Sequence, residues 1–198
     1  MRNKILILGG YGNFGSRIAQ ALAKDEIEII IAGRNKKKAE ILREKILAKY
    51  PQSKLEIAIF DVNLQLENYL LKLQPVAIIN TCGPFQNSDY NVAKTCIKCG
   101  VNYIDLSDGR DFVNEILVLD EEARKNNVSV ISGASTVPAL SSAVLEKYKN
   151  EFAKIDSLKF GISPGAKASR GLATTKAILS YLGKPLKPFH GSKNKIYD

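Results

Sequence analysis

The 198-residue sequence predicts a doubly wound α/β fold with a parallel sheet, followed by the start of an α+β second domain. Three observations support this prediction. Six apolar runs are nearly continuous rather than alternating in polarity, as expected for strands covered on both faces. Segments with helical periodicity lie between the first runs, and glycine or proline closes several of them. This alternation of strand and helix is typical of a parallel sheet with helical crossovers.

The elements follow in chain order. The predicted strands are KILIL, IEIIIAG, LEIAIF, VAIIN, NYIDL and VSVIS. The first helix carries Phe14, Ile18, Ala21 and Leu22 on one face, and the second, from Lys36, carries Ala39, Leu42, Ile46 and Leu47. Pro51, Pro75 and Gly100 stand where helices end or strands begin.

The pattern changes after Ser135, so we expect one domain over 1–137 and the beginning of a second over 138–198. The second part is predicted to contain a helix from Pro138 to about Lys149, a strand from Ile155 and a helix over 172–182. Its last residues, 183–198, are rich in lysine, proline and glycine.

The composition excludes several classes of protein. The net charge is +9, but residues 1–145 contribute only +2 and residues 146–198 contribute +7, without interleaved aromatic residues for stacking bases. We therefore expect no nucleic-acid partner. An acidic partner would also explain the positive charge of residues 146–198. No apolar stretch is long enough to span a membrane, and three cysteines form no disulfide framework. The sequence thus predicts a cytoplasmic protein without a membrane partner.

The stretch GGYGNFG directly follows the first strand and opens the first helix. Gly10, Gly12 and Gly15 give the spacing in which glycines permit a tight turn, close approach of a pyrophosphate and close helix packing. Anionic phosphates are favoured at the N-terminus of the helix that follows. The alternative is a plain glycine-rich turn. We predict that the whole loop binds a dinucleotide, through Gly9, Gly10, Tyr11, Gly12, Asn13, Phe14 and Gly15.

The end of the second strand, AGRNKKK, favours one dinucleotide over another. Arg34 stands where NAD sites place an acidic residue for the ribose 2′-hydroxyl, and Asn35 and the lysines after it add donors and positive charge. NADP is therefore predicted as the cofactor, and NAD is less favoured. The alternative for the lysines is an ordinary solvated helix start.

Other strand ends should line the same crevice, because ligands bind at the carboxyl ends of parallel strands. Asp61 and Val62 follow the third strand, on the side expected for the adenine. Five further predicted cofactor contacts follow the fourth and fifth strands: Thr81, Cys82, Gly83, Pro84 and Ser107.

These motifs, together with FDVN, INTCGPFQNSDYNVAKTCIKCGVNYIDLSDGRDF and VSVISGASTVPAL, resemble the NADP-binding Rossmann domain of the saccharopine dehydrogenase family over residues 3 to 145. The resemblance implies an NADP-dependent oxidoreductase acting on a small substrate, such as an amino acid or polyamine at a C–N bond. It also implies a longer second domain, a homodimer in the full-length protein, and a truncated, inactive chain here. GASTVPAL departs from the turn of the lysine-pathway reductases, which leaves the substrate open.

The sequence assigns no catalytic residue and no metal site. Asp105 and Asp108 are candidates for proton transfer, although Asp108 and Arg110 suit a turn equally well. Cys82 and His190 lack the partners of a nucleophilic pair, and Cys96-x-x-Cys99 lacks further zinc ligands. Lys167 and Arg170, before a helix start with Thr174 and Thr175, are a hypothetical carboxylate site. The alternative functions are a non-catalytic NADP sensor and an S-adenosylmethionine methyltransferase, and Arg34 argues against the second.

Overall fold

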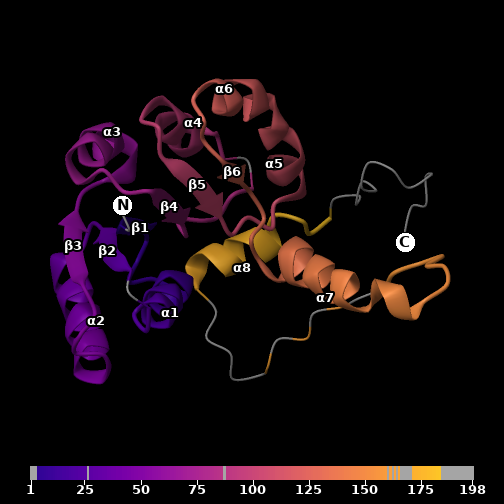
Figure 1. The fold of residues 1–198 in the computed structure, drawn as a ribbon, viewed down its shortest axis with the longest axis horizontal. Helices are drawn as coiled ribbons and strands as arrows, with labels where there is room; N and C mark the ends of the chain where they lie inside the picture. The colour runs from indigo at the N-terminus through magenta and orange to yellow at the C-terminus, as the bar shows by residue number, and fades with distance from the viewer. Residues whose placement is uncertain are drawn as a thin grey trace.

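A computed structural model describes residues 4–25, 27–86, 88–159, 161, 163, 165 and 171–183. Its centre is a six-stranded sheet with the order β3-β2-β1-β4-β5-β6, in which every pairing is parallel (Figure 1). The predicted doubly wound α/β fold and all six predicted strands are confirmed. The strands are β1 (Lys4–Leu8), β2 (Glu28–Gly33), β3 (Leu55–Ile59), β4 (Ala77–Asn80), β5 (Asn102–Asp105) and β6 (Val130–Ile131).

Successive residues of β1 serve opposite faces of the sheet, as strand geometry requires. Leu6 and Leu8 belong to one buried cluster and Ile7 belongs to another, and all three side chains are almost completely buried. The nearly continuous apolar runs in the sequence therefore reflect a sheet with a hydrophobic layer on each side.

Helices α1 (Asn13–Leu22) and α2 (Lys36–Lys49) cover one face of the sheet (Figure 1). Ala19 of α1 packs there with Leu42 and Ile46 of α2, against Ile7 and Ile31 of the strands. The predicted apolar face of α2 is confirmed by these contacts. The face predicted for α1 is only partly right: Ile18 and Leu22 pack against the cluster, but Phe14 and Ala21 are exposed, because the buried side of the helix is centred on Gly15 and Ala19. Lys49 is the last residue of α2, two positions before Pro51, which cannot continue the helix.

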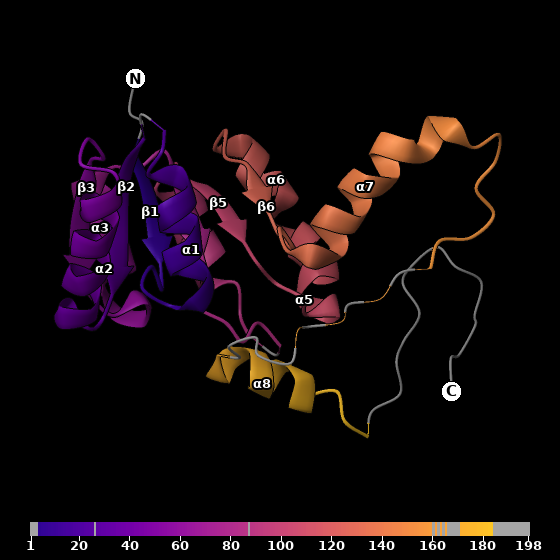
Figure 2. The same ribbon diagram turned by 90° about the horizontal axis from the view of Figure 1, so that it is seen from below.

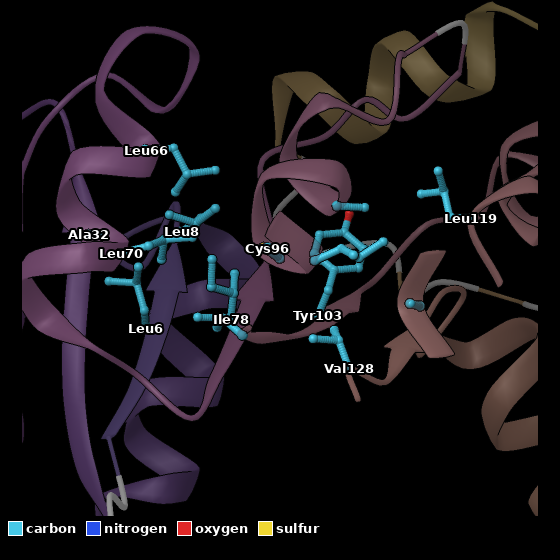
Figure 3. Packing of buried hydrophobic residues seen from close by; sticks show 14 of the residues in the cluster. Leu6, Leu8, Ala32, Leu66, Leu70, Ile78, Cys96, Tyr103, Leu119 and Val128 are labelled. Atoms are coloured by element: carbon cyan, nitrogen blue, oxygen red, sulfur yellow. The ribbon is translucent and has the colours of Figure 1, made fainter. Parts of the chain in front are cut away.

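The other face is covered by α3 (Val62–Leu73), α4 (Asn91–Lys98), α5 (Arg110–Glu115), the 3₁₀ turn η1 (Ile116–Leu119) and α6 (Asp120–Lys125). Figure 3 shows Leu66 and Leu70 of α3 beside Leu6 and Leu8, with Tyr103 further along the same layer. Cys96 is fully buried in this layer, which supports a packing role for the Cys96-x-x-Cys99 pair.

The chain after β6 is less tightly packed. A π-helical turn, η2 (Thr136–Leu140), is interrupted by extended backbone at Val137 and leads into α7 (Ser141–Tyr148) and the 3₁₀ turn η3 (Lys149–Glu151). Figure 2 shows α7 extending away from the sheet, whereas α8 (Leu172–Leu179) lies below the strands' carboxyl ends. Both predicted helices are present. The strand predicted from Ile155 is wrong for residues 155–159, which are irregular and exposed, and among the described residues no strand pairs with them.

The direction in which the chain adds strands reverses between β1 and β4. From β1 the chain builds outward through β2 and β3 on one side, and then returns to add β4, β5 and β6 on the other side. At such a reversal, the loops at the carboxyl ends diverge and leave a crevice for a ligand. Across the described ranges, none of the helices combines the length and the apolar character needed to cross a membrane.

Candidate dinucleotide site

The turn after β1 is held against two neighbouring strands. Gly9 adopts φ +68°, a left-handed conformation that favours glycine, and its carbonyl accepts a 2.8 Å hydrogen bond from the N–H of Gly12. A Cβ at Gly9 would lie 2.8 Å from Thr81 Oγ1, so the loop passes directly over the end of β4. The N–H of Gly10 donates to Ala32 O on β2 at 2.9 Å.

The glycines of the motif have different tasks. Gly15 lies against the backbone of Gly9 and Gly10, where a Cβ would approach Gly10 Cα to 2.8 Å, so its lack of a side chain allows the helix to pack. Gly12 is the N-cap residue of α1, and a Cβ there would meet only Gly9 O, at 3.0 Å. Among the described residues, no side chain caps this helix start, and a helix N-terminus favours an anionic ligand. The open position therefore coincides with the predicted pyrophosphate site.

Arg34 stands beyond the end of β2 with its side chain 80% exposed. Its Nη1 lies 3.8 Å from Asp61 Oδ2, a solvent-exposed pairing that contributes little to stability. The structure thus brings together two predicted site residues that follow different strands. Arg34 has the exposure needed to reach a phosphate.

Asn35 and Asp61 both act as helix N-caps. Asn35 Oδ1 accepts from the N–H of Lys38 at 3.0 Å, and Asp61 Oδ1 accepts from the N–H of Asn63 at 2.9 Å. These bonds hold the starts of α2 and α3 at the crevice. Val62 is the first residue of α3 and also packs against the buried layer, so its predicted contact with the adenine stays a prediction.

The segment after β4 lies next to the glycine turn. The Thr81 hydroxyl donates to Leu8 O at 2.7 Å and lies 3.2 Å from Gly9 O, which ties the ends of β1 and β4 together. The peptide bond between Gly83 and Pro84 is cis. These positions place the predicted residues 81–84 along the crevice.

Cys82 is not a ready nucleophile. Desolvation by neighbouring atoms raises the pKa of its thiol to about 11, against a smaller lowering effect of Arg34. The residue keeps solvent-exposed surface, but the thiol stays protonated at neutral pH. Cys82 is therefore better explained as a small residue that fills a tight turn than as a nucleophile.

The end of β5 is built around a fully buried carboxylate. Asp105 Oδ1 accepts from the N–H groups of Ser107 (2.9 Å) and Gly133 (3.0 Å), and the Ser132 hydroxyl lies 2.9 Å from both carboxylate oxygens. These bonds connect the ends of β5 and β6. Asp105 therefore has a structural role, and because its side chain is fully buried it cannot contact a substrate.

Ser107 is also fully buried, and its hydroxyl accepts from the N–H of Gly109 at 3.1 Å. The Ser107 side chain stabilises the turn from inside and is not exposed to the crevice. The geometry therefore gives no support to its predicted contact with the cofactor.

A buried polar pair under the crevice was missed by sequence reasoning. Asn80 Nδ2 lies 3.2 Å from the Tyr103 hydroxyl oxygen, and Asn80 Oδ1 accepts from the N–H of Cys82 at 3.0 Å. Burial raises the pKa of Tyr103, which keeps the phenol neutral. The sequence signal that could have identified Asn80 is its place as a polar residue at the end of an otherwise apolar strand.

Gln86 and Asp108 meet on the β5 side of the crevice. Gln86 Nε2 donates to Asp108 Oδ1 at 2.9 Å, whereas Gln86 Oε1 is buried without a donor among the described residues. Nearby, the N–H of Arg110 donates to the hydroxyl of Tyr181, just after α8, at 3.4 Å. The segment that follows α8 therefore contacts the start of α5, and Figure 2 shows α8 near the carboxyl ends of the strands.

Only part of the hypothetical carboxylate site lies within the described residues. Thr174 and Thr175 lie in the first turns of α8, whereas Lys167, Arg170 and His190 lie outside the described residues. Within the described ranges, no three His, Cys, Asp or Glu side chains gather as metal ligands would.

Comparisons with known proteins agree with this geometry. The family model of the saccharopine dehydrogenase NADP binding domain matches residues 5–131. A search of the curated proteins found no match. The predicted family resemblance and the predicted NADP cofactor are confirmed by the family model.

Solved structures share the fold at low sequence identity. An NADPH-dependent reductase involved in bacilysin biosynthesis (YwfH) is 15% identical over 67% of this chain and 76% of that chain, with a TM-score of 0.52. A citronellol catabolism dehydrogenase from Pseudomonas aeruginosa PAO1 is 16% identical over 66% of this chain and 72% of that chain, with a TM-score of 0.53. At this identity, the likeness concerns the fold alone.

Proposed function

This chain belongs to the saccharopine dehydrogenase NADP binding domain family, and we propose that it is the cofactor-binding part of an NADP-dependent oxidoreductase. One observation carries the proposal. The glycine turn is tied to the ends of β2 and β4, the exposed Gly12 begins α1 without a side-chain cap, and the guanidinium of Arg34 is exposed beyond the end of β2. This arrangement suits a ligand with a pyrophosphate and a further phosphate.

Each strand end is proposed to bind a different part of the cofactor. The N-terminus of α1 and the loop 9–15 would hold the pyrophosphate, and Arg34 with the lysines of the α2 start would hold the 2′-phosphate. Asp61 and Val62 border the adenine side, and residues 81–84 border the ribose and nicotinamide side. When bound, NADP(H) supplies the hydride chemistry, while these residues bind and orient it.

The substrate is proposed to be a small molecule, for example an amino acid or polyamine that reacts at a C–N bond. Gln86, Asp108 and α8 lie on the side of the crevice where the nicotinamide is proposed. The neutral Cys82 thiol and the enclosed Asp105 carboxylate are poor proton carriers, so the acid or base is proposed to be the exposed Asp108 or a residue after β6.

We further propose a second domain from residue 138 onward, a homodimeric full-length protein and a cytoplasmic location. Support for a further packing layer comes from apolar side chains spaced four residues apart along η2, α7 and the following turn. Leu140, Val144, Tyr148 and Phe152 are each between 42% and 58% exposed. A helix that exposes such a stripe is expected to pack against another element.

The cofactor site is tested by calorimetry with the variant Arg34→Ala. We expect NADPH binding to weaken by about 1.5–3 kcal/mol, the range for hydrogen bonds to charged groups, and NADH binding to stay the same. Equal affinity of the wild-type protein for NADPH and NADH would contradict the proposal.

Asp61→Asn is a matched control for Arg34→Ala. It removes the negative charge 3.8 Å from Arg34 but keeps an oxygen that can cap α3. NADPH affinity should be preserved or slightly increased, because the carboxylate opposes a phosphate at this place. A loss equal to that of Arg34→Ala would mean that the ion pair, rather than the guanidinium, is required.

A further inference from the structure

Tyr11 of the glycine loop reaches the end of β2, although it lies 24 positions before Asn35 in the sequence. Its hydroxyl accepts a 2.8 Å hydrogen bond from the backbone N–H of Asn35. Its ring lies over Gly33, where a Cβ would come within 2.5 Å of Cε1 and 2.7 Å of Cζ. The ring thus occupies the space that any side chain at position 33 would need.

The ring of Tyr11 belongs to the hydrophobic layer between the sheet and helices α1 and α2. It is half-buried and packs against the cluster that includes Ile31 and Ala39. A ring held by this packing on one side and by Gly33 on another is a fixed part of the fold rather than a mobile cover.

Asn35 is restrained from its other side as well, because its side chain accepts the N–H of Lys38 and caps α2. Arg34 therefore projects from a backbone corner that is fixed between Gly33 and Asn35. A charged side chain on a rigid base loses less conformational freedom when it binds a phosphate. In addition, the Asn35 N–H is already used, so recognition of the phosphate depends on side chains.

We propose that Tyr11 is a positioning residue for selection of the 2′-phosphate, acting through the backbone of Asn35 on the placement of Arg34. This inference rests on the cofactor site proposed above. The corner lies at the end of β2, where the adenosine ribose is expected, whereas the pyrophosphate is assigned to the α1 start. Tyr11 should therefore affect the 2′-phosphate more than the rest of the nucleotide.

The test uses the full chain, the variant Tyr11→Phe and two probes, AMP and adenosine 2′,5′-bisphosphate, with Kd measured by calorimetry. The ratio of the two Kd values isolates the 2′-phosphate. We expect Tyr11→Phe to lower this selectivity about three- to tenfold, as loss of one neutral hydrogen bond predicts, with AMP binding unchanged. Gly33→Ala should lower the ratio too, because its Cβ would displace the ring.

Tyr90→Phe is the matched control, because the Tyr90 hydroxyl also forms one hydrogen bond with a backbone group, here by donating to Phe112 O at 3.0 Å, but on the other face of the sheet. It should leave the ratio unchanged. An unchanged ratio in Tyr11→Phe overturns the inference. An increased ratio also overturns it, since the hydroxyl would then be blocking an N–H that the phosphate uses. Equal weakening of both probes would show a general structural role only.

The same measurements separate this inference from the proposed cofactor site. A wild-type protein without preference for the bisphosphate rejects both. A preference that Arg34→Ala abolishes and Tyr11→Phe leaves intact rejects only the role of Tyr11.

Discussion

Gly15, on the first turn of α1, lies directly against the carbonyl oxygen of Gly9, so a side chain at position 15 would collide with backbone atoms of the loop. This contact brings the helix start close to the end of β1. The motif thus contains two kinds of glycine. Gly15 is needed for packing of the fold, whereas Gly12 leaves space for a ligand.

Gly12→Ala and Gly15→Ala should therefore have different effects. Gly12→Ala is expected to fold, because its Cβ would meet only Gly9 O at 3.0 Å, but to lose NADPH binding at least tenfold through contact with the pyrophosphate. Gly15→Ala should lower the free energy of unfolding by about 1–3 kcal/mol, as overpacking does. Urea unfolding and calorimetry distinguish the two, and equal destabilisation by both variants would contradict this division.

Cys82 should react slowly with iodoacetamide at neutral pH. Desolvation disfavours the thiolate and raises the pKa to about 11, so the labelling rate should rise about tenfold per pH unit and level off only near pH 11. Mass spectrometry of pulse-labelled protein measures the rate, with Cys82→Ser to assign the modified site. NADPH should slow the reaction by covering residues 81–84, and rapid labelling at pH 7 would show that the thiol is activated.

Asp105→Asn should destabilise the fold. The carboxylate accepts from two backbone N–H groups and the Ser132 hydroxyl, and an amide in its place turns an NH₂ group toward some of these donors. We expect the free energy of unfolding to fall by about 2–3 kcal/mol. The exposed Asp108→Asn is the control, with a change within about 0.5 kcal/mol. Wild-type stability of Asp105→Asn would show that the clamp contributes little.

Much of the architecture followed from local sequence patterns. The apolar runs at Leu6–Leu8 and Ile29–Ile31 and the helical spacing of Ala39, Leu42 and Ile46 are properties of a few consecutive residues, so they predicted the strands and helices of the sheet. The glycine turn and Arg34 were recognisable for the same reason, because each stands at a set position relative to one strand. The strand predicted from Ile155 failed because an apolar run forms a strand only where a neighbouring strand can pair with it.

The tertiary structure decided which polar groups meet. Tyr11 with Asn35 and Asp105 with Gly133 pair across different strand ends, and their meeting depends on strand order and register, which local patterns do not contain. The same is true of Ser107, which follows its strand as predicted but is enclosed by the turn around it. The sequence by itself thus determined the parallel sheet and the helices that follow its first strands, and it predicted where a dinucleotide would bind. Packing between distant segments decided which residues face that crevice and which are used to hold it together, because each buried donor and acceptor must find a partner where the chain brings one.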